Sequence, residues 1–403
     1  MDTEELTIPR TRLDFQDQSF VDDPYPALRE LRELGPVVYH EDLRQYIVAR
    51  YKECMAVFSD PHAFFSPPEL FRSMFGGETI ISMDVDRHDE TRAIWAESFT
   101  RRGVEPQRGM IAGVVDTCLA PLVERMRSGE RVDLVGELAR PIPALVIARL
   151  LGIPTKDHPQ FSDWSDGMVK LAEGATDAGP EAAENLRVGM AATAALNEYL
   201  ATTLIPRERA SRCPADLIGQ LVDSPVCATM TAQDMTAQAT LLVFAGNETT
   251  TKLMAMTLYA LARFPDQRRL LSENRDLIPR AIEEINRWMS VVHVGFRVAR
   301  DGKGLVSGVR IPDGETVLVL QGAANRDPAR WDNPDVLDVL RTPRSHLGFG
   351  FGMHHCLGFN LARLEVEVVL NRLLDEIPDW EVVDIDWGRG WVARGPVRLE
   401  IGI

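Results

Sequence analysis

The sequence predicts a mainly α protein with small β-sheets, and three observations support this. Residues 89–264 follow a helical hydrophobic pattern almost throughout, broken by clusters of Pro and Gly. Strand-like runs are short and lie near the two ends of the chain. No internal repeat, low-complexity tract or flexible linker divides the sequence, so we expect residues 1–403 to form a single domain.

The first third predicts a small sheet beside helices. The segment "YPALRELRE" (25–33) has a helical pattern, and "PVVYH" (36–40) and "QYIVAR" (45–50) read as strands. A further helix is predicted for "YKECMAVFS" (51–59).

A long helix is predicted to end at Phe264, just before Pro265. Thr231 and Asp234 form a capping-box-like pair at its start. At about 1.5 Å per residue, such a helix can cross the whole molecule. Gly246 lies midway, where glycine lowers helix stability, so we expect the fold to compensate for it.

Strand patterns return in the last quarter of the chain. Residues 304–321 alternate around a "PDG" turn, and residues 379–401 read as a final hairpin.

Charge and composition exclude several classes of protein. The formal net charge is −16 and no block of Lys and Arg occurs, so we expect no nucleic-acid partner. The N-terminal "MDTEELTIPRTRLDF" lacks a secretory pattern and no 18-residue apolar run follows, so we expect a cytoplasmic protein without a membrane partner. We also expect a monomer. The five cysteines lack CxxC spacing, which is typical of a reducing compartment: Cys54, Cys118, Cys213, Cys227 and Cys356.

The segment "HLGFGFGMHHCLGFNLAR" (346–363) concentrates glycine, histidine and cysteine ahead of a predicted helix. A dinucleotide loop is disfavoured, because the glycines lack G-x-G-x-x-G spacing. A zinc site is also disfavoured, because the adjacent His354, His355 and Cys356 cannot easily all point at one tetrahedral ion.

A third interpretation uses every feature of this segment. Cys356 precedes an apolar helical run, and a helix N-terminus favours the thiolate that binds iron. Glycines would let the backbone pass close to a flat macrocycle and direct N–H groups at the sulfur. We expect Phe349 to cover that face. The glycines concerned are Gly350, Gly352 and Gly358.

The ten residues "FGFGMHHCLG" resemble the haem-binding signature of the cytochrome P450 family, Phe-Gly-x-Gly-x-His-x-Cys-x-Gly, without a departure. The resemblance implies the cytochrome P450 fold, haem b (iron protoporphyrin IX) as cofactor, and Cys356 as the proximal ligand of the haem iron. The order of the family's motifs is kept from His88 onward, so the resemblance covers nearly the full chain.

The middle of the long helix carries residues suited to the distal side of the haem, the side away from Cys356. A carboxylate and a hydroxyl over the haem could relay protons and hold water, and Glu248 and Thr249 lie within an apolar helix. The segment "AGNETT" (245–250) also resembles the family's acid-alcohol motif, with Glu248 the acid and Thr249 the alcohol.

Two haem propionates require charge-assisted donors, best supplied by arginine. The resemblance implies where they lie: the His-x-x-x-Arg helix, the "RVA" segment, the signature histidine and, more weakly, the loop entry. The residues are His88, Arg92, Arg297, His354 and His346.

The Glu-x-x-Arg motif of the family is present in "EEINR" (283–287). Glu284 and Arg287 lie one helical turn apart, close enough to pair. With Arg341 they resemble the buried ion network that braces the cysteine loop, and we assign these three residues to structure. The turn "ANRDP" (324–328) is also family-like, whereas Val291 departs from the proline of many bacterial members.

The resemblance implies a monooxygenase that uses dioxygen to hydroxylate, O-dealkylate or epoxidise a largely apolar small organic molecule. Electrons must come from another protein, expected to be a ferredoxin with its NAD(P)H-dependent reductase. Arg101, Arg102, Arg344 and Arg363 are candidates for its docking site. A peroxide-driven peroxygenase and a haem-binding sensor without turnover remain as alternatives.

Substrate contacts are expected one turn before the acid-alcohol pair of the long helix and directly before Arg297. The aromatic-rich segment 64–80 is expected to line the entrance to the substrate pocket. The candidate residues are Leu241, Phe244, Ala245, Val292, His293 and Val294.

Overall fold

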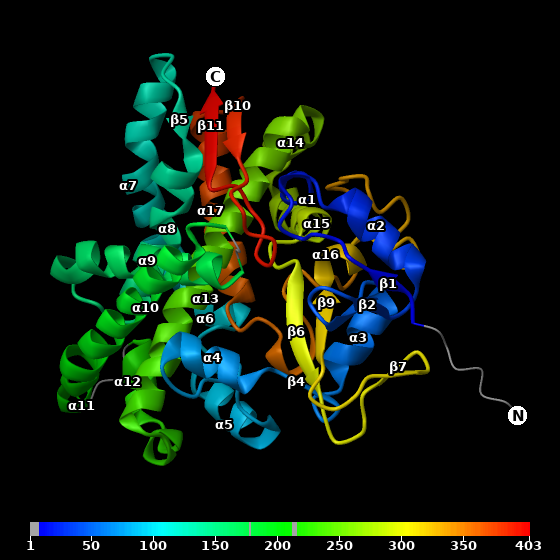
Figure 1. Cartoon of the computed structure of the whole chain (residues 1–403). Helices are drawn as coiled ribbons and strands as arrows, with labels where there is room; N and C mark the ends of the chain where they lie inside the picture. Colours follow the sequence, from blue (N-terminus) through cyan, green and yellow to red (C-terminus); the bar gives the residue numbers. More distant parts are fainter. Residues whose placement is uncertain (1–7, 177–178, 212–215) are drawn as a thin grey trace, which may run out of the picture. The chain divides into compact units, whose positions relative to one another are not determined.

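The computed structural model of the protein describes residues 8–176, 179–211 and 216–403, so Cys213 lies outside the described residues. The chain divides into two compact units, each built from three separate segments (Figure 1). The first unit comprises Met1–Pro67, Glu283–Cys356 and Arg389–Arg394, and the second Pro68–Ile282, Leu357–Gly388 and Gly395–Ile403.

The first unit carries most of the strands. Its elements are β1 (Arg10–Thr11), α1 (Gln18–Asp22), α2 (Tyr25–Leu34), β2 (Val38–His40), β3 (Gln45–Val48), α3 (Tyr51–Ser59), β4 (Phe64–Phe65), β6 (Val294–Ala299), β7 (Leu305–Val306), β8 (Val309–Arg310), β9 (Thr316–Leu320), α16 (Gln321–Ala324) and the single-turn η7 (Gly352–His354). Helix α15 (Ile278–Met289) belongs partly to each unit.

Six strands of the first unit form one sheet in the order β1-β2-β3-β9-β6-β4. The predicted helices α2 and α3 and the predicted strands β2 and β3 are confirmed, and the structure shows that the two strands pair antiparallel. The strand pattern and the "PDG" turn predicted within residues 304–321 are confirmed, and the N–H of Glu315 donates to the carbonyl of Pro312 at 3.2 Å. The strands on the two sides of this turn do not pair with each other: β8 pairs with β7 around Ser307 and Gly308, and β9 pairs with β3 and β6 because its buried residues fill the centre of the larger sheet.

The second unit is almost wholly helical. Its elements are α4 (Pro68–Phe75), α5 (Val85–Ala96), α6 (Arg101–Val104), η1 (Glu105–Gln107), α7 (Arg108–Arg127), β5 (Val132–Asp133), η2 (Val135–Ala139), α8 (Pro141–Leu150), η3 (Thr155–Asp157), α9 (His158–Thr176), α10 (Ala182–Tyr199), η4 (Leu200–Leu204), α11 (Ile205–Ser211), α12 (Leu217–Asp223), η5 (Pro225–Thr229), α13 (Ala232–Arg263), α14 (Pro265–Glu273), η6 (Arg275–Leu277), α17 (Phe359–Glu376), β10 (Glu381–Asp386) and β11 (Arg398–Gly402).

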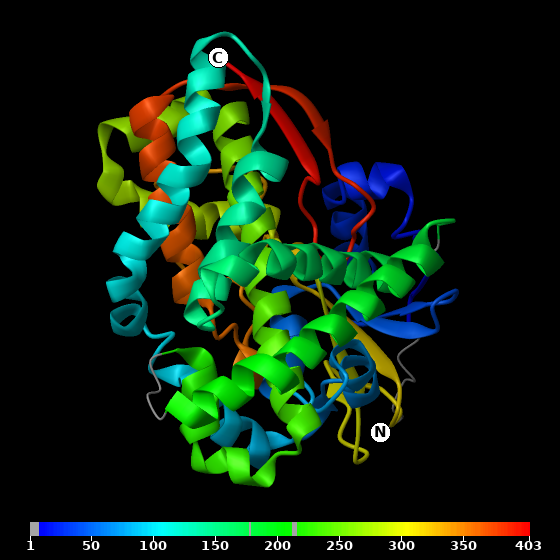
Figure 2. The ribbon, with the colours of Figure 1, turned by 90° about the vertical axis from the view of Figure 1, so that its left-hand side faces the viewer.

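Helix α13 is the long helix that the sequence predicts. Thr231 is its N-cap, and the side chains of Thr231 and Asp234 form a complete capping box. It packs against α8, α17, α9 and α10, and α17 also packs against α7 (Figure 2). The predicted C-terminal hairpin is confirmed as β10 and β11, to which β5 adds a third strand. In the part of the chain that the structure describes, no helix is both long and apolar enough to cross a membrane.

A buried histidine lies in the core of the first unit. Nε2 of His293 is 2.9 Å from the carbonyl oxygen of Met289, so this nitrogen donates the hydrogen bond. The ring tilts against Tyr25, with 6.0 Å between the centroids. Burial lowers the pKa of His293 to about 3, and the charge of Arg394 adds to the effect. The imidazole is therefore neutral in the folded protein at neutral pH.

Because His293 has a lower pKa folded than unfolded, we expect acid to destabilise the protein through it. Between pH 6.5 and about pH 3, His293 binds a proton in the unfolded chain but not in the folded chain. The unfolding free energy therefore falls by up to about 1.4 kcal/mol for each pH unit by which the pH is lowered across this window. The variant H293Q should show a shallower pH dependence in urea unfolding followed by circular dichroism. The exposed His62 provides the control H62Q, which should keep the wild-type slope; equal slopes in all three proteins would contradict the assignment.

Candidate cofactor and active site

The loop that carries Cys356 is closed by its own backbone. The N–H of Cys356 donates to the carbonyl of Phe349 at 2.9 Å, and the N–H of Gly350 donates to the carbonyl of Leu347 at 2.9 Å. The single turn η7 lies between Gly350 and Cys356 in the sequence. Cys356 itself is half-buried and lies three residues before α17, whose N-terminus favours a thiolate.

Two glycines of this loop have backbone conformations that L side chains rarely adopt. The φ angles are +70° at Gly350 and +73° at Gly352. A Cβ atom at position 352 would also lie 2.2 Å from the carbonyl oxygen of Phe58 on α3. Gly358 differs, because a Cβ there would meet no protein atom within 4 Å. The first two glycines are thus required by the fold, whereas the space beside Gly358 lets another group approach.

Phe58 connects the cysteine loop to the sheet. Its ring would lie 2.9 Å from a Cβ at Gly295, and the guanidinium carbon of Arg297 lies 4.8 Å from the ring centroid. Phe58 was not identified from the sequence, because nothing within "YKECMAVFS" marks one aromatic side chain as the contact of segments more than 200 residues away.

Arg297 is a buried cation on β6, with 9% of its surface exposed. Nη1 donates to the carbonyl of Phe296 at 2.8 Å, and burial lowers the pKa of the guanidinium to about 10. Among the described residues no carboxylate lies within 4.0 Å of it. A buried charge requires a partner of opposite sign. An anionic cofactor such as haem, with its propionates, fits this site.

The strand that carries Arg297 was not predicted. Apolar residues alternate at 292, 294, 296 and 298, which is the signal that identifies β6.

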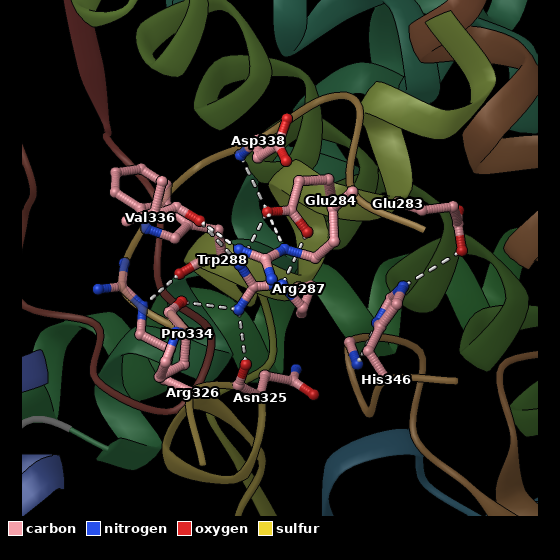
Figure 3. Close-up of polar contacts among 12 residues, drawn as sticks. Glu283, Glu284, Arg287, Trp288, Asn325, Arg326, Pro334, Val336, Asp338 and His346 are labelled. Atoms are coloured by element: carbon pink, nitrogen blue, oxygen red, sulfur yellow. Dashed lines mark hydrogen bonds and ion pairs between the residues drawn. The ribbon is translucent and has the colours of Figure 1, made fainter. Parts of the chain in front are cut away.

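Glu284 and Arg287 form a buried ion pair on α15, with Nε 2.7 Å and Nη2 2.8 Å from the two carboxylate oxygens (Figure 3). The remaining N–H groups of Arg287 donate to the carbonyls of Asn325, Pro334 and Val336. All five guanidinium hydrogens therefore have an acceptor. Nε of Arg341 donates to the same carboxylate at 2.9 Å, so the structure brings the three residues of the predicted network together.

Asn325 links this network to the cysteine loop. Its carbonyl accepts from Arg287, and its side-chain Oδ1 accepts from the N–H of Leu347 at 2.7 Å. Its Nδ2 donates to Ser290 Oγ at 2.8 Å. The turn that contains Asn325 is recognisable in the sequence, but the role of Asn325 itself is not.

His346, at the loop entry, has both ring nitrogens engaged within the first unit. Nε2 is 3.2 Å from a carboxylate oxygen of Glu283, and Nδ1 accepts from the N–H of Gly348 at 3.0 Å (Figure 3). These contacts give His346 a role in ordering the loop. His354, at the end of η7, is half-buried.

In the second unit, α13 is buried along nearly its whole length. Between Met235 and Leu258 every residue is buried except Phe244, Ala245, Gly246 and Thr249. A Cβ at Gly246 would meet Ile147 at 3.6 Å, an ordinary contact, so helix packing alone does not require glycine there. These four residues form a window in the middle of the helix, which we call the α13 window.

The acid and the alcohol of α13 have different partners. Thr249 lies in the α13 window, and its hydroxyl donates to the carbonyl of Ala245 at 2.8 Å. Glu248 is buried, and one of its oxygens is 2.6 Å from Nζ of Lys252. Lys252 was not identified from the sequence, although its i,i+4 spacing from Glu248 is a recognised signal of an ion pair.

His88 and Arg92 lie one turn apart on α5, where residues i and i+4 share a face. Nδ1 of the buried His88 is 2.7 Å from Oδ1 of Asp89. Burial lowers the pKa of His88, and the bond to Asp89 partly offsets this.

The predicted substrate contacts fall into two groups. Phe244 and Ala245 belong to the α13 window, and the ring of Phe244 packs edge-on against Phe75 with 5.5 Å between centroids. Leu241 is buried one turn earlier. In the first unit, Val294 is a core residue of the sheet and Val292 forms a β-bridge with Ala393.

His293 belongs to the same segment, and the core contacts described above give it a structural role.

Comparisons with known proteins agree on one family. The sequence profile "Cytochrome P450" matches residues 22–377. The chain is 34% identical to mycinamicin IV hydroxylase/epoxidase of Micromonospora griseorubida, over 92% of this chain and 94% of that protein. It is 33% identical to 6-deoxyerythronolide B hydroxylase of Saccharopolyspora erythraea, over 96% and 98%. The structure of the bacillaene polyketide synthase cytochrome P450 PksS of Bacillus subtilis 168 superimposes with a TM-score of 0.85 at 28% identity, covering 97% and 99% of the chains.

Removal of the Arg287 side chain should destabilise the protein strongly. The variant R287A removes one of the two arginines that contact the buried Glu284 carboxylate, and it leaves the carbonyls of Asn325 and Pro334 without this donor, which costs about 3–5 kcal/mol. We expect lower haem content after expression, measured from the ratio of Soret to protein absorbance. The control R269A breaks an exposed pair with Asp266 and should stay within about 0.5 kcal/mol of wild type. Normal haem content in R287A would refute the bracing role.

Gly352 should tolerate no side chain. The variant G352A imposes both the positive φ angle and the clash with the Phe58 carbonyl, whereas G314A imposes a φ of +84° in open space. We expect G314A to cost about 1–2 kcal/mol and G352A clearly more, with loss of haem in G352A alone. Urea unfolding and haem content measure the difference; equal behaviour of the two variants would show that the clash is relieved.

Proposed function

Because the chain belongs to the cytochrome P450 family and is thus a haem b monooxygenase, we propose that it oxidises a largely apolar small organic molecule by hydroxylation, epoxidation or O-dealkylation, with electrons from a ferredoxin and its NAD(P)H-dependent reductase. The observation that carries this proposal is the α13 window, which places Thr249 on the accessible face of an otherwise buried helix. Relatives named as hydroxylases and as an epoxidase support the reaction types.

We assign Cys356 as the ligand of the haem iron. When bound, the haem activates dioxygen and transfers one of its oxygen atoms to the substrate. The closed backbone of the loop and the left-handed conformation at Gly350 and Gly352 support this role, since they fix the cysteine in one place. The carbonyl of Phe349 accepts the N–H of Cys356, and its ring would cover the face of the haem on this side. Gly358, where a Cβ would have no neighbour within 4 Å, would leave space for the cofactor.

The propionates would be held by Arg297, His88, Arg92 and His354. Arg297 has the strongest support, because its buried charge has no carboxylate partner among the described residues. Arginine offers several N–H groups in a fork that fits a carboxylate. We leave out His346, because Glu283 and Gly348 already engage its two ring nitrogens.

Thr249 and Glu248 would govern protons at the distal side. A hydroxyl in the α13 window can hold a water molecule or pass a proton, and Glu248 is the adjacent carboxylate. A relay of this kind is not needed by a protein that only binds haem, which favours an enzyme over a sensor.

Apolar residues suit a largely apolar substrate. Phe244, Ala245 and Leu241 are our proposed contacts, together with the edge of Phe75 in the segment predicted to line the entrance. Val292, Val294 and His293 are not included, because sheet pairing and core packing account for them.

The docking site for the electron donor would include three arginines of the second unit. Arg101 and Arg102 are exposed on α6, which packs against α17, and Arg363 of α17 lies over the ring of Phe359 at 4.7 Å. Exposed arginines attract an acidic protein and raise its association rate even when the net charge of the whole chain is negative. Arg344 is exposed in the first unit and completes the set proposed from the sequence.

We also propose that residues 1–403 act as one catalytic domain in the cytoplasm, as a monomer. Each compact unit is made of three segments separated in sequence, so no single cut in the chain would release either of them. Scattered cysteines without CxxC spacing are typical of a reducing compartment.

The first test is the spectrum of the dithionite-reduced protein with carbon monoxide. We expect the strongly red-shifted Soret band of a thiolate-ligated haem in the wild type, and its loss in C356H at similar haem content. The buried Cys54 provides the control C54A, which should keep the red-shifted band. A band typical of histidine ligation in the wild type would refute the assignment of Cys356.

Turnover assays then distinguish a monooxygenase from a peroxygenase and from a haem-binding sensor. Substrate-dependent NAD(P)H consumption with product formation supports the monooxygenase. Faster product formation with peroxide alone would instead indicate a peroxygenase, and haem binding without turnover would indicate a sensor.

A further inference from the structure

Asn197 of α10 connects two other helices of the second unit, a link that we call the Asn197 bridge. Its Nδ2 donates to the carbonyl of Phe75, the last residue of α4, at 3.0 Å. Its Oδ1 accepts from the hydroxyl of Thr240 on α13 at 2.7 Å. Only the NH2 group of the amide can serve a carbonyl, so these two partners fix its orientation. Helices α4, α10 and α13 pack against one another, and the Asn197 bridge joins all three (Figure 1).

The hydroxyl of Thr240 is directed away from its own helix. Thr249 and Thr257, on the same helix, donate instead to the carbonyl four residues earlier, which is the usual bond of a helical threonine. Thr240 is 0% exposed, and burial of a hydroxyl is costly unless it has a partner. Asn197 supplies this partner and thereby ties α13 to α10.

Two glycines bring the chain that follows α4 close to Asn197 and to α13. Gly76 has a φ of +81°, and a Cβ there would lie 3.1 Å from Nδ2 of Asn197. A Cβ at Gly77 would lie 2.9 Å from the carbonyl oxygen of Gln233 and 3.0 Å from Cβ of Ala237. Both glycines therefore let the end of α4 approach the other two helices.

Side chains of α13 hold the next residues of this segment. Oδ1 of Asp234 accepts from the N–H of Glu78 at 2.9 Å, and Oε1 of Gln238 accepts from the N–H of Ile80 at 3.1 Å. Nε2 of Gln238 donates back to the carbonyl of Glu78 at 3.3 Å. These bonds anchor the later part of the segment to α13, and the Asn197 bridge adds the anchor at the end of α4.

The Asn197 bridge lies one helical turn from the α13 window. Thr240 and Phe244 are four residues apart, so they share a face of α13. The ring of Phe244 packs edge-on against the ring of Phe75, whose carbonyl Asn197 binds. The bridge thus holds the backbone of one ring of this aromatic pair, and α13 itself carries the other ring.

We infer that Asn197 is a positioning residue that clamps Phe75 against Phe244, so that the aromatic pair forms a fixed wall and limits the width of the molecule that the site accepts. This inference rests on the proposed binding of substrate at the α13 window and adds the residue that sets the size limit. A molecule that fits beside the closed pair benefits from a wall that is already in place. A wider molecule binds only when the pair separates, at the expense of the Asn197 bridge.

Hydrogen–deuterium exchange of the haem-loaded protein tests the clamp. We expect faster exchange of residues 72–80 in N197A and in T240V, which removes the hydroxyl but keeps the shape of the side chain, and wild-type exchange in T240S. The matched control is T257V, because Thr257 is equally buried on the same helix but bonds to the carbonyl of Leu253 in that helix. Unchanged exchange in both N197A and T240V would overturn the clamp.

Nitrogen ligands of the haem iron test the size limit without knowledge of the substrate. Imidazole, 4-phenylimidazole and 1-tritylimidazole share the coordinating ring but differ in width, and each shifts the Soret band on binding. We expect imidazole to bind all variants equally. The preference for 4-phenylimidazole over 1-tritylimidazole should fall about tenfold in N197A and T240V, roughly the effect of one or two neutral hydrogen bonds, and should stay unchanged in T240S and T257V. An unchanged preference in N197A and T240V, or an equal loss of affinity for all three ligands, would overturn the role in selection.

These measurements are independent of turnover. Neither exchange nor ligand binding needs an electron donor, so a protein that oxidises no substrate can still support the clamp. A wild type that binds none of the three ligands would overturn the size limit, because the iron would then not be open to the α13 window, and the exchange result would still decide whether the Asn197 bridge holds α4.

Discussion

The first unit depends on the burial of one guanidinium group. Arg287 is 1% exposed, and each of its five N–H groups has an acceptor supplied by Glu284 or by the carbonyls of three residues between 325 and 336. A buried charge without such partners would be prohibitively costly, so these segments must take up one arrangement together. The constraint passes to the cysteine loop through Asn325, which accepts from Arg287 with its carbonyl and from Leu347 with its side chain.

A second constraint on the loop comes from helix α3. Gly352 lies so close to the backbone of Phe58 that no side chain fits, and the ring of Phe58 contacts Gly295 and Arg297. Cys356 and Arg297 thus share one rigid support. This arrangement suits the proposed roles of Cys356 as metal ligand and Arg297 as donor to the propionates, because small displacements of either would weaken binding.

The second unit carries the proposed distal residues on one helix. Between Met235 and Leu258, helix α13 is buried except at Thr249 and the three other residues of the α13 window. Glu248, one residue away, is turned into the buried face and paired with Lys252. Thr249 is therefore accessible while the adjacent Glu248 is buried, because consecutive residues of a helix point about 100° apart around its axis.

The sequence by itself determined the local features of this protein. It predicted α2, α3, the capping box of α13, the C-terminal hairpin and the family signature around Cys356, because each depends on residues that are neighbours in the chain. It also named Glu284, Arg287 and Arg341. Tertiary structure decided the rest: β9 joined the central sheet beside β3 and β6, Phe58 became a contact of distant segments, and the ion pair of Glu248 and Lys252, whose spacing is local, became buried. Strand partners, close backbone approaches and the choice between surface and buried ion pairs depend on which segments pack together, and no local pattern records that choice.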